Sequence, residues 1–134
     1  MRTSVGQASR LSKHSRIEKD SLGEKKIPED AYYGIQTLRA LENFPISGMR
    51  LPLEMVRAIA LIKMAAAQTN MELGGLPRKK GMALIKAAKE VSDGKFNSQF
   101  SVDVFQAGAG TSFNMNANEV IANRAIEHLK GKKG

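Results

Sequence analysis

The stretch Gln106–Arg124, QAGAGTSFNMNANEVIANR, decides the fold class and the position of the candidate site. Two glycines, Gly108 and Gly110, precede Thr111 and Ser112, and a helix-like pattern begins at once. Glycine lets the backbone approach a ligand closely, and the first turn of a helix offers N–H groups and the positive end of the helix dipole. The stretch therefore predicts a site for a small anion, most simply a carboxylate or a phosphate.

An ordinary turn followed by a common helix cap is the alternative, because glycines often precede helices. Two better-known phosphate motifs do not match. The P-loop requires Lys after its last glycine, whereas Thr111 follows Gly110. The dinucleotide fingerprint requires three glycines at fixed offsets after a strand, and only Gly108 and Gly110 are present. From chemistry alone, the anion site and the ordinary cap both stay open.

The rest of the chain is expected to be mainly α, with one small β element near its start. Turn residues and apolar periodicity predict a hairpin over 17–27 and helices over 32–42, 53–73, 77–91 and 112–129. Asp30 is expected to cap the first helix and Gly131 to cap the last. Residues 96–105 are expected to form an extended or irregular connection.

Two of these helices have a predicted buried face. In the helix over 53–73, apolar or small side chains recur at alternating spacings of four and three, at Met55, Ile59, Ile62, Ala66, Thr69 and Leu73. In the helix over 77–91, the face consists of Gly81, Leu84, Ile85, Ala88 and Val91. We expect both faces to pack against other helices.

Composition excludes several classes of site. The 134 residues suffice for one domain with a core, and they contain no Cys and only two His. A disulfide framework and a Cys-based zinc site are thus excluded, and a His-based metal site or a Ser–His–Asp triad is not expected. No apolar run is long enough to span a bilayer, and no secretory signal is present. We therefore expect a cytoplasmic protein without a metal, a cofactor or a membrane partner.

The formal charge of +8 is concentrated at the two ends of the chain. Residues 1–16 contribute +4 and residues 130–134 contribute +3, which leaves +1 for residues 17–129. Residues 1–15 are therefore predicted to be a flexible basic leader and residues 16–134 one domain. Nucleic-acid binding is not expected, because no aromatic side chain lies among the basic residues of either end.

Three sequence blocks carry a resemblance to a known family. GAGTSFNMNANEVIANRAIE is similar to the first signature block of the aspartase/fumarase superfamily. RIEKDSLGEKKIPEDAYYGIQTLRALENF, residues 16–44, resembles the N-terminal segment of that family, and the similarity continues through NSQFSVDVFQ and covers about residues 16–129. Fumarases usually read GSGTQSNMN at the signature, whereas GAGTSFNMN with AYYGIQTLRA upstream resembles aspartate ammonia-lyase.

The resemblance implies a fold, a reaction and partners. The fold would be the N-terminal domain of the aspartase/fumarase fold, without the central helical-bundle domain. Family members remove ammonia or water from a succinyl-type substrate to give fumarate, after a proton is taken from the carbon next to a carboxylate. Well-placed donors to the charge on that carboxylate are worth roughly 3 kcal/mol each. The implied partners are a small dicarboxylate, L-aspartate or fumarate, and three further copies in a homotetramer.

The family's signature assigns candidate substrate-binding residues by position. Thr111 matches the threonine that binds a substrate carboxylate, and Gly110 and Ser112 flank it with backbone N–H groups. Asn114 and Asn116 match the two asparagines of the NMN motif, and we interpret them as shaping the site or bridging to neighbouring segments. Capping of the helix N-terminus is the alternative for both asparagines.

Arg39 matches an arginine of the family's TLRA segment with a proposed role near the substrate carboxylate. A structural salt bridge is its alternative. The family's general base is a serine in a GSSxMPxKxN loop, which does not occur in these 134 residues, so no catalytic residue is assigned. We expect the 134-residue chain to be inactive as a lyase by itself.

Three functions follow as hypotheses. The first is the N-terminal part of an aspartate ammonia-lyase, active only with the rest of the enzyme. The second is the corresponding part of a fumarate hydratase. The third is a non-catalytic module that binds a carboxylate or another protein.

Overall fold

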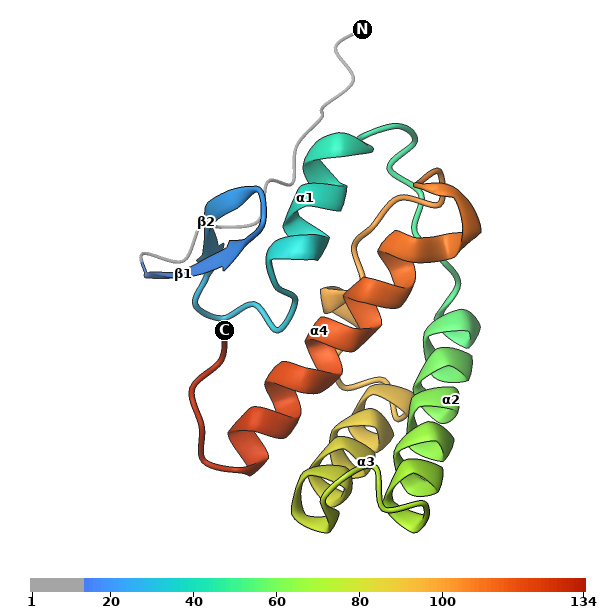
Figure 1. Cartoon of the computed structure of the whole chain (residues 1–134). Coiled ribbons are helices and arrows are strands. Elements are labelled where there is room, and N and C mark those ends of the chain that lie inside the picture. The colour runs from blue at the N-terminus through green and yellow to red at the C-terminus, as the bar shows by residue number, and fades with distance from the viewer. Residues whose placement is uncertain (1–13) are drawn as a thin grey trace, which may run out of the picture.

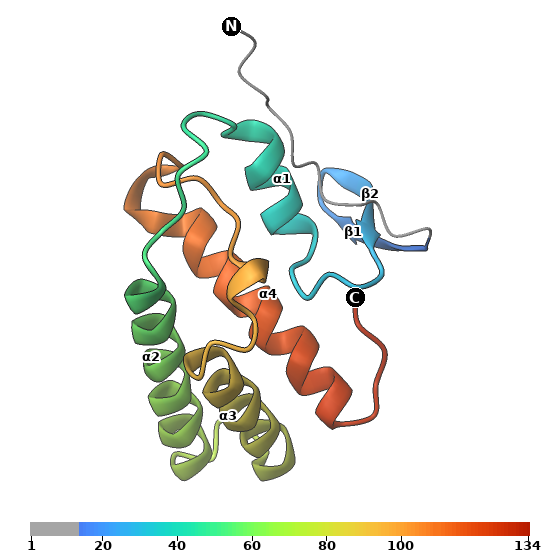
Figure 2. The same ribbon diagram turned by 180° about the vertical axis from the view of Figure 1, so that it is seen from behind.

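The computed structural model describes residues 14–134. Within them a hairpin and α-helices follow one another as β1 (Ser15–Asp20), β2 (Gly23–Pro28), α1 (Ile35–Asn43), α2 (Leu53–Glu72), α3 (Arg78–Ser92) and α4 (Thr111–His128), with short 3-10 turns at Asn97–Gln99 and Gly108–Gly110. Helix α4 runs diagonally through the middle, with the α2–α3 pair on one side and α1 with the hairpin on the other (Figure 1). The view from behind shows the same arrangement (Figure 2). The prediction of a mainly α fold with a small hairpin is confirmed.

The hairpin forms where the turn residues predicted it. Strands β1 and β2 are antiparallel, with Ser15 opposite Pro28 and Asp20 opposite Gly23. Gly23 has φ 116°, a conformation that favours glycine, and Asp20 accepts a hydrogen bond from the N–H of Leu22 at 2.9 Å. Residues 1–13 of the predicted leader lie outside the described residues. Ser15, the leader's last residue, already belongs to β1.

Arg16 shows that part of the basic N-terminal charge belongs to the folded body. Its side chain is buried and donates hydrogen bonds to the carbonyl oxygens of Pro28 (3.1 Å), Ala31 (2.8 Å) and Tyr33 (2.8 Å). It also pairs with Glu18 at 2.8 Å. Three carbonyl acceptors and one carboxylate satisfy most of the guanidinium donors, which is what a buried arginine requires. Arg16 therefore joins the hairpin to the segment that leads into α1.

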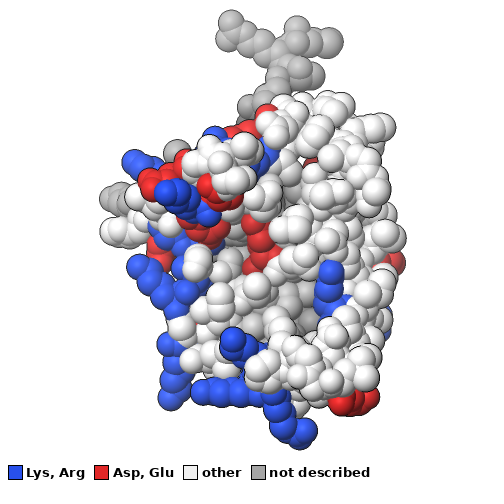
Figure 3. All heavy atoms as spheres, in the orientation of Figure 1, with Lys and Arg blue, Asp and Glu red and all other residues white. Residues whose placement is uncertain are grey.

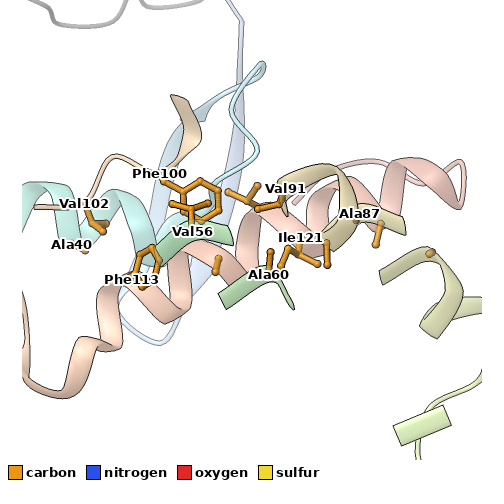
Figure 4. Packing of buried hydrophobic residues seen from close by; sticks show 14 residues of the cluster. Ala40, Val56, Ala60, Ala87, Val91, Phe100, Val102, Phe113 and Ile121 are labelled. Carbon is orange, nitrogen blue, oxygen red and sulfur yellow. The ribbon is translucent and has the colours of Figure 1, made fainter. Parts of the chain in front are cut away.

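The core lies between α4 and the α2–α3 pair. Its main members come from all three helices and from the connection before α4, and Figure 4 shows them side by side: Val56, Ala60, Ala87, Val91, Phe100, Val102, Phe113 and Ile121. Alanines at the contacts let the helix backbones approach closely. Because burial of each larger side chain contributes about 1.5–3 kcal/mol, this cluster fixes the direction of α4.

The predicted buried face of α2 is wrong. The buried side chains are Val56, Ala60 and Ala67, whereas Ile62 and Leu73 of the predicted face are 65% and 78% exposed. Helix α2 is apolar or small on two sides, so periodicity alone does not say which side packs. The alanine side faces α3 and α4 because it permits the closer approach. The other side leaves an apolar stripe on the surface of residues 14–134.

The predicted face of α3 is largely confirmed. Gly81, Ala88 and Val91 are buried, and Leu84 and Ile85 are half-buried. A Cβ at Gly81 would overlap the side chain of Met71 in α2. The glycine therefore permits the close contact between α2 and α3.

The ends of α1 and α4 differ in detail from the prediction. Helix α1 begins at Ile35 with Gly34 as its N-terminal cap residue, so Asp30 does not cap it. At the end of α4, Lys130 rather than Gly131 adopts the left-handed conformation, with φ 62°. The N–H of Lys130 donates to the carbonyl of Glu127, and the N–H of the next residue donates to that of Ile126, both at 2.9 Å. This is a Schellman motif in which the glycine lies one position further along.

Within residues 14–134, no helix combines the length and apolar character needed to cross a membrane.

Candidate functional site

The glycine-rich loop lies on the surface at the N-terminus of α4. Ala109 (φ 62°) and Gly110 (φ 69°) are both left-handed, and residues 107–111 are exposed. The N-terminal cap residue of α4 is Gly110, which has no side chain to accept an N–H of the helix. The first turn of α4 contains no acidic residue. The hydroxyl of Thr111 donates to the carbonyl of Gly108 at 3.2 Å. This helix end therefore lacks an internal anion, although its backbone favours one.

Asp103 fixes the chain just before the loop. Its buried carboxylate accepts hydrogen bonds from the N–H and hydroxyl of Ser47 (2.7 and 2.8 Å), from the N–H of Gly48 (2.7 Å) and from the N–H of Phe105 (2.9 Å). Burial raises the pKa of Asp103, but these donors outweigh burial and lower it to about 2. The loop therefore starts from a rigid point.

Gln106 connects that rigid point to α4. Its Nε2 donates to the carbonyl of Asp103 at 2.9 Å, and its Oε1 accepts the N–H of Phe113 at 2.7 Å. One side chain thus spans the glycine segment and fixes both of its ends. Sequence reasoning missed these roles of Asp103 and Gln106. The NSQFSVDVFQ block, which carries the family resemblance and contains both residues, was the available signal.

The three other candidates in the signature point into the protein. Ser112 is buried, and the Asn114 side-chain oxygen accepts a hydrogen bond from Lys63 Nζ of α2 at 2.8 Å. Asn116 is completely buried, and its Nδ2 donates to the carbonyl of Gln99 at 3.0 Å. The Oδ1 of Asn116 has no hydrogen-bond partner within residues 14–134. The two asparagines therefore bridge to neighbouring segments, and neither caps the helix.

Arg39 lies against the hairpin. Its Nε and Nη2 donate to the two carboxylate oxygens of Asp20, both at 2.7 Å, and Nη2 also donates to the carbonyl of Gly23 at 3.2 Å. The hydrogen bonds from Arg39 lower the pKa of the Asp20 carboxyl group. Within the described part of the chain, all hydrogen bonds of this guanidinium go to the hairpin. The structural salt bridge is thus the interpretation that the structure supports.

The N-terminus of α1 is a second helix end, and protein carboxylates occupy it. Glu119 of α4 accepts hydrogen bonds from the N–H groups of Gly34 (3.0 Å), Gln36 (2.8 Å) and Thr37 (3.0 Å) and from the Thr37 hydroxyl. Glu18 of β1 accepts the N–H of the first residue of α1 at 2.8 Å. A Cβ at Gly34 would lie 2.7 Å from the Glu18 carboxylate and 2.9 Å from that of Glu119. A methyl group at this position would therefore displace the two carboxylates from the N–H groups that they accept.

Polar contacts between Arg124 and His128 of α4 and Glu90 of α3 hold the C-terminal end of α4. Arg124 donates through two nitrogens to the Glu90 carboxylate of α3, and His128 Nε2 lies 3.2 Å from the same carboxylate. The hydrogen bond from Arg124 is the main cause that lowers the pKa of Glu90 to about 2, and burial opposes it. This cluster joins α4 to α3 at the end opposite the glycine loop.

An open cavity of about 420 Å³ lies between α2, α3 and α4, and Lys63, Asn70 and Asn118 supply its polar lining. No three His, Asp or Glu side chains of residues 14–134 gather so that they could hold a metal ion.

Comparisons with known proteins place the chain in a family. The sequence model described as Lyase matches residues 23–133. An aspartate ammonia-lyase from Bacillus sp is 59% identical over 119 residues, which cover 89% of this chain and 25% of the relative. A class II fumarate hydratase from Halobacterium salinarum is 56% identical over 119 residues, which cover 89% of this chain and 25% of that relative. The chain thus spans about a quarter of the length of the curated relatives it matches.

A solved structure agrees with the sequence matches. The fumarate lyase:delta crystallin of Brucella melitensis has a TM-score of 0.88 and is 56% identical, covering 90% of this chain and 29% of that one. The family match covers most of the chain, and the signature block forms the exposed glycine loop and the helix behind it. The chain therefore belongs to the Lyase family of the aspartase/fumarase superfamily and corresponds to an N-terminal portion of its members.

Proposed function

We propose that residues 108–112 bind one carboxylate of L-aspartate, as part of a longer, cytoplasmic aspartate ammonia-lyase. The observation that carries the proposal is the N-terminus of α4, which is exposed, follows two left-handed residues and has no acidic residue of its own. An external carboxylate would satisfy the donors and the dipole that α4 leaves unmatched.

Each candidate residue has a distinct part in the proposal. The Thr111 hydroxyl donates to the substrate carboxylate, and the backbone N–H groups of Gly110 and Ser112 add donors beside it. Asn114 and Asn116 act indirectly, because they hold α4 against Lys63 and Gln99. Arg39 is left out, since its guanidinium is occupied by the hairpin.

Such a loop would promote the reaction by stabilising the negative charge that develops on the substrate carboxylate. When a base removes the proton next to the carboxylate, negative charge moves onto the carboxylate oxygens. The fixed backbone N–H groups stabilise these oxygens without rearrangement, and the Thr111 hydroxyl joins them by turning away from the Gly108 carbonyl. The lyase serine loop is not part of these residues, so we expect no turnover from the 134-residue chain itself. The apolar stripe with Ile62 and Leu73 supports assembly with further protein, and we propose a homotetramer for the longer enzyme.

L-Aspartate is preferred over L-malate because of the signature. Ala109 stands where fumarases usually carry serine, which removes a hydroxyl from the loop. Fumarate hydratase is the second candidate, because the relative from Halobacterium salinarum is nearly as similar as the aspartate ammonia-lyase.

A hybrid enzyme tests the proposal. This chain replaces the matched segment of the Bacillus aspartate ammonia-lyase, and fumarate formation is followed from L-aspartate and, separately, from L-malate. We expect turnover of L-aspartate, and Thr111→Val should lower kcat/KM by about 100-fold, as expected for loss of one donor to an oxyanion.

Ser21→Ala serves as the control, because this serine of the hairpin turn is also exposed and the substitution removes one hydroxyl. Equal kinetics of the two variants would contradict the role of Thr111. Preference for L-malate would favour the fumarate hydratase. No turnover, combined with Thr111-dependent binding of succinate by the 134-residue chain, would favour the non-catalytic module.

A further inference from the structure

A basic hollow lies between α3 and the C-terminal end of α4, at the end of α4 opposite the glycine loop. Its volume is about 510 Å³, and its lining includes the side chains of Lys79, Met82, Ile85, Lys86, Lys89 and His128. Figure 3 shows Lys and Arg side chains gathered along the lower and left edges of the face where α3 and the end of α4 lie. The hollow combines a cationic rim with an apolar floor.

The lysines of the hollow are available to a ligand. Within residues 14–134, the side chains of Lys79 and Lys86 make no hydrogen bond or ion pair. Lys89 pairs with Asp93 at 3.0 Å, but both side chains are largely exposed, and such pairs are weak and easily exchanged. Glu90, the nearby acid, is already engaged by Arg124 and His128. The charges of Lys79 and Lys86 are therefore not neutralised within residues 14–134, and that of Lys89 is held only by an exposed pair.

The lysines of the hollow are spread along α3. Lys79, Lys86 and Lys89 are separated by seven and three residues, so they lie along one side of α3 over about 15 Å. The first turn of α3 also contains no acidic residue, although its cations stand at the positive end of the helix dipole. This arrangement costs the fold stability rather than adding to it. A bound anion would offset this loss of stability, because its charge is opposite to that of the lysines and of the helix N-terminus.

We propose that this hollow binds a small organic polyanion of the nucleoside polyphosphate class. The three ammonium groups contact the phosphates as point charges, while Met82 and Ile85 cover the face of the base. The volume lies in the range of small-molecule sites. Because Thr111 and His128 are the two ends of an 18-residue helix, the hollow lies about 25 Å from the carboxylate loop and does not depend on the proposed function.

Calorimetric titration of the 134-residue chain with ATP at fixed ionic strength, without divalent ions, tests the proposal. We expect saturable binding of one ATP per chain. The double variant Lys79→Gln/Lys86→Gln should weaken it at least about tenfold, because two charge-assisted contacts are lost. Met82→Ser should weaken binding of ATP but leave that of inorganic triphosphate unchanged, since only the nucleoside touches the apolar floor.

Matched controls separate a site from general attraction. Lys19→Gln/Lys26→Gln removes the same charge from exposed hairpin positions and should leave the affinity for ATP unchanged. Thr111→Val should also leave it unchanged, which distinguishes failure here from failure of the carboxylate site. Equal weakening by both lysine pairs, non-saturable binding, or equal affinity for ATP and triphosphate in the unsubstituted chain would overturn the proposal.

Discussion

The N-termini of α1 and α4 present the same backbone chemistry but different occupancy. At α1, Glu119 and Glu18 accept the N–H groups of the first turn, so two protein carboxylates fill the anion position. At α4, the neutral side chain of Gln106 accepts one N–H, and the first turn contains no acid. Both helix ends favour an anion. The comparison teaches that an internal carboxylate makes such an end structural, whereas the exposed end of α4 has no protein carboxylate to match its dipole.

The two ends are also physically connected. Glu119, which caps α1, lies on α4, two turns after Thr111. The helix whose own first turn contains no acidic residue therefore supplies the carboxylate that closes the N-terminus of α1. Loss of this carboxylate should disturb the fold, whereas changes at the α4 end should act on binding.

Removal of the Glu119 carboxylate should have the largest effect. Glu119→Ala leaves three backbone N–H groups and the buried Thr37 hydroxyl without their acceptor, so we expect the free energy of unfolding to fall by about 3 kcal/mol. Urea denaturation measures it. Glu24→Ala, an exposed glutamate of β2, is the control and should change little. Equal stability of the two variants would show that the carboxylate does not hold α1.

Addition of a methyl group at Gly34 should have the next largest effect. Its φ of −123° suits any residue, so Gly34→Ala acts only through the new Cβ, which would displace the carboxylates of Glu18 and Glu119. We expect a loss of about 2 kcal/mol in the free energy of unfolding, measured by urea denaturation. Gly75→Ala is the matched control, because a Cβ there meets only a carbonyl oxygen at 3.7 Å. A loss of the same size in both variants would argue against the steric explanation.

These two positions show what the sequence could and could not predict. The hairpin, the helices α2 and α3 and the glycine loop before α4 were predicted because turn residues and periodicity are local signals. The cap of α1 was not predicted, since its acceptor, Glu119, lies 85 residues from Gly34 in the chain. A nearby acid, Asp30, looked sufficient but does not reach the helix end. Pairings between distant residues leave no periodic signal.

The prediction of the buried face of α2 was wrong for a different reason. Both sides of α2 carry apolar or small residues, and the decision depends on which side fits α3 closely. Ala60 and Ala67 fit, while Ile62 and Leu73 stay at the surface. At the candidate site, the position of Thr111 was predicted. The support from Asp103 and Gln106 was not, because it depends on tertiary hydrogen bonds.

The contacts of Glu90 with Arg124 and His128 at the C-terminal end of α4 should make the stability of the fold depend on pH. The pKa of Glu90 is about 2 in the folded protein against 4.5 for a free carboxyl, so its stabilisation is complete above pH 4.5 and is lost as the pH falls towards 2. Glu90→Gln should lower the free energy of unfolding by about 1.5 kcal/mol at pH 7. The difference from the unsubstituted chain should narrow below pH 4.5 and become small near pH 2, where half of the Glu90 carboxyl groups are protonated.

Thermal denaturation between pH 2 and 7 follows this difference, with Glu24→Gln as the control that removes an equal charge from an exposed position. The anion positions at both helix ends are unchanged in Glu90→Gln, so succinate binding should stay the same. A constant difference across the whole pH range would contradict the assignment of the lowered pKa to Glu90.

An acid placed at the open helix end should have the smallest effect on stability and should make α4 resemble α1. Thr111→Asp puts a carboxylate into the first turn of α4, next to the unmatched dipole, and should raise the free energy of unfolding by about 0.5 kcal/mol. The same carboxylate takes the place of the ligand and repels it, so binding of succinate should be lost. Thr111→Asn offers an uncharged side chain of the same size and should keep weak binding. Urea denaturation and succinate titration of the same samples measure both effects. Stabilisation without loss of binding would mean that the ligand does not use this helix end.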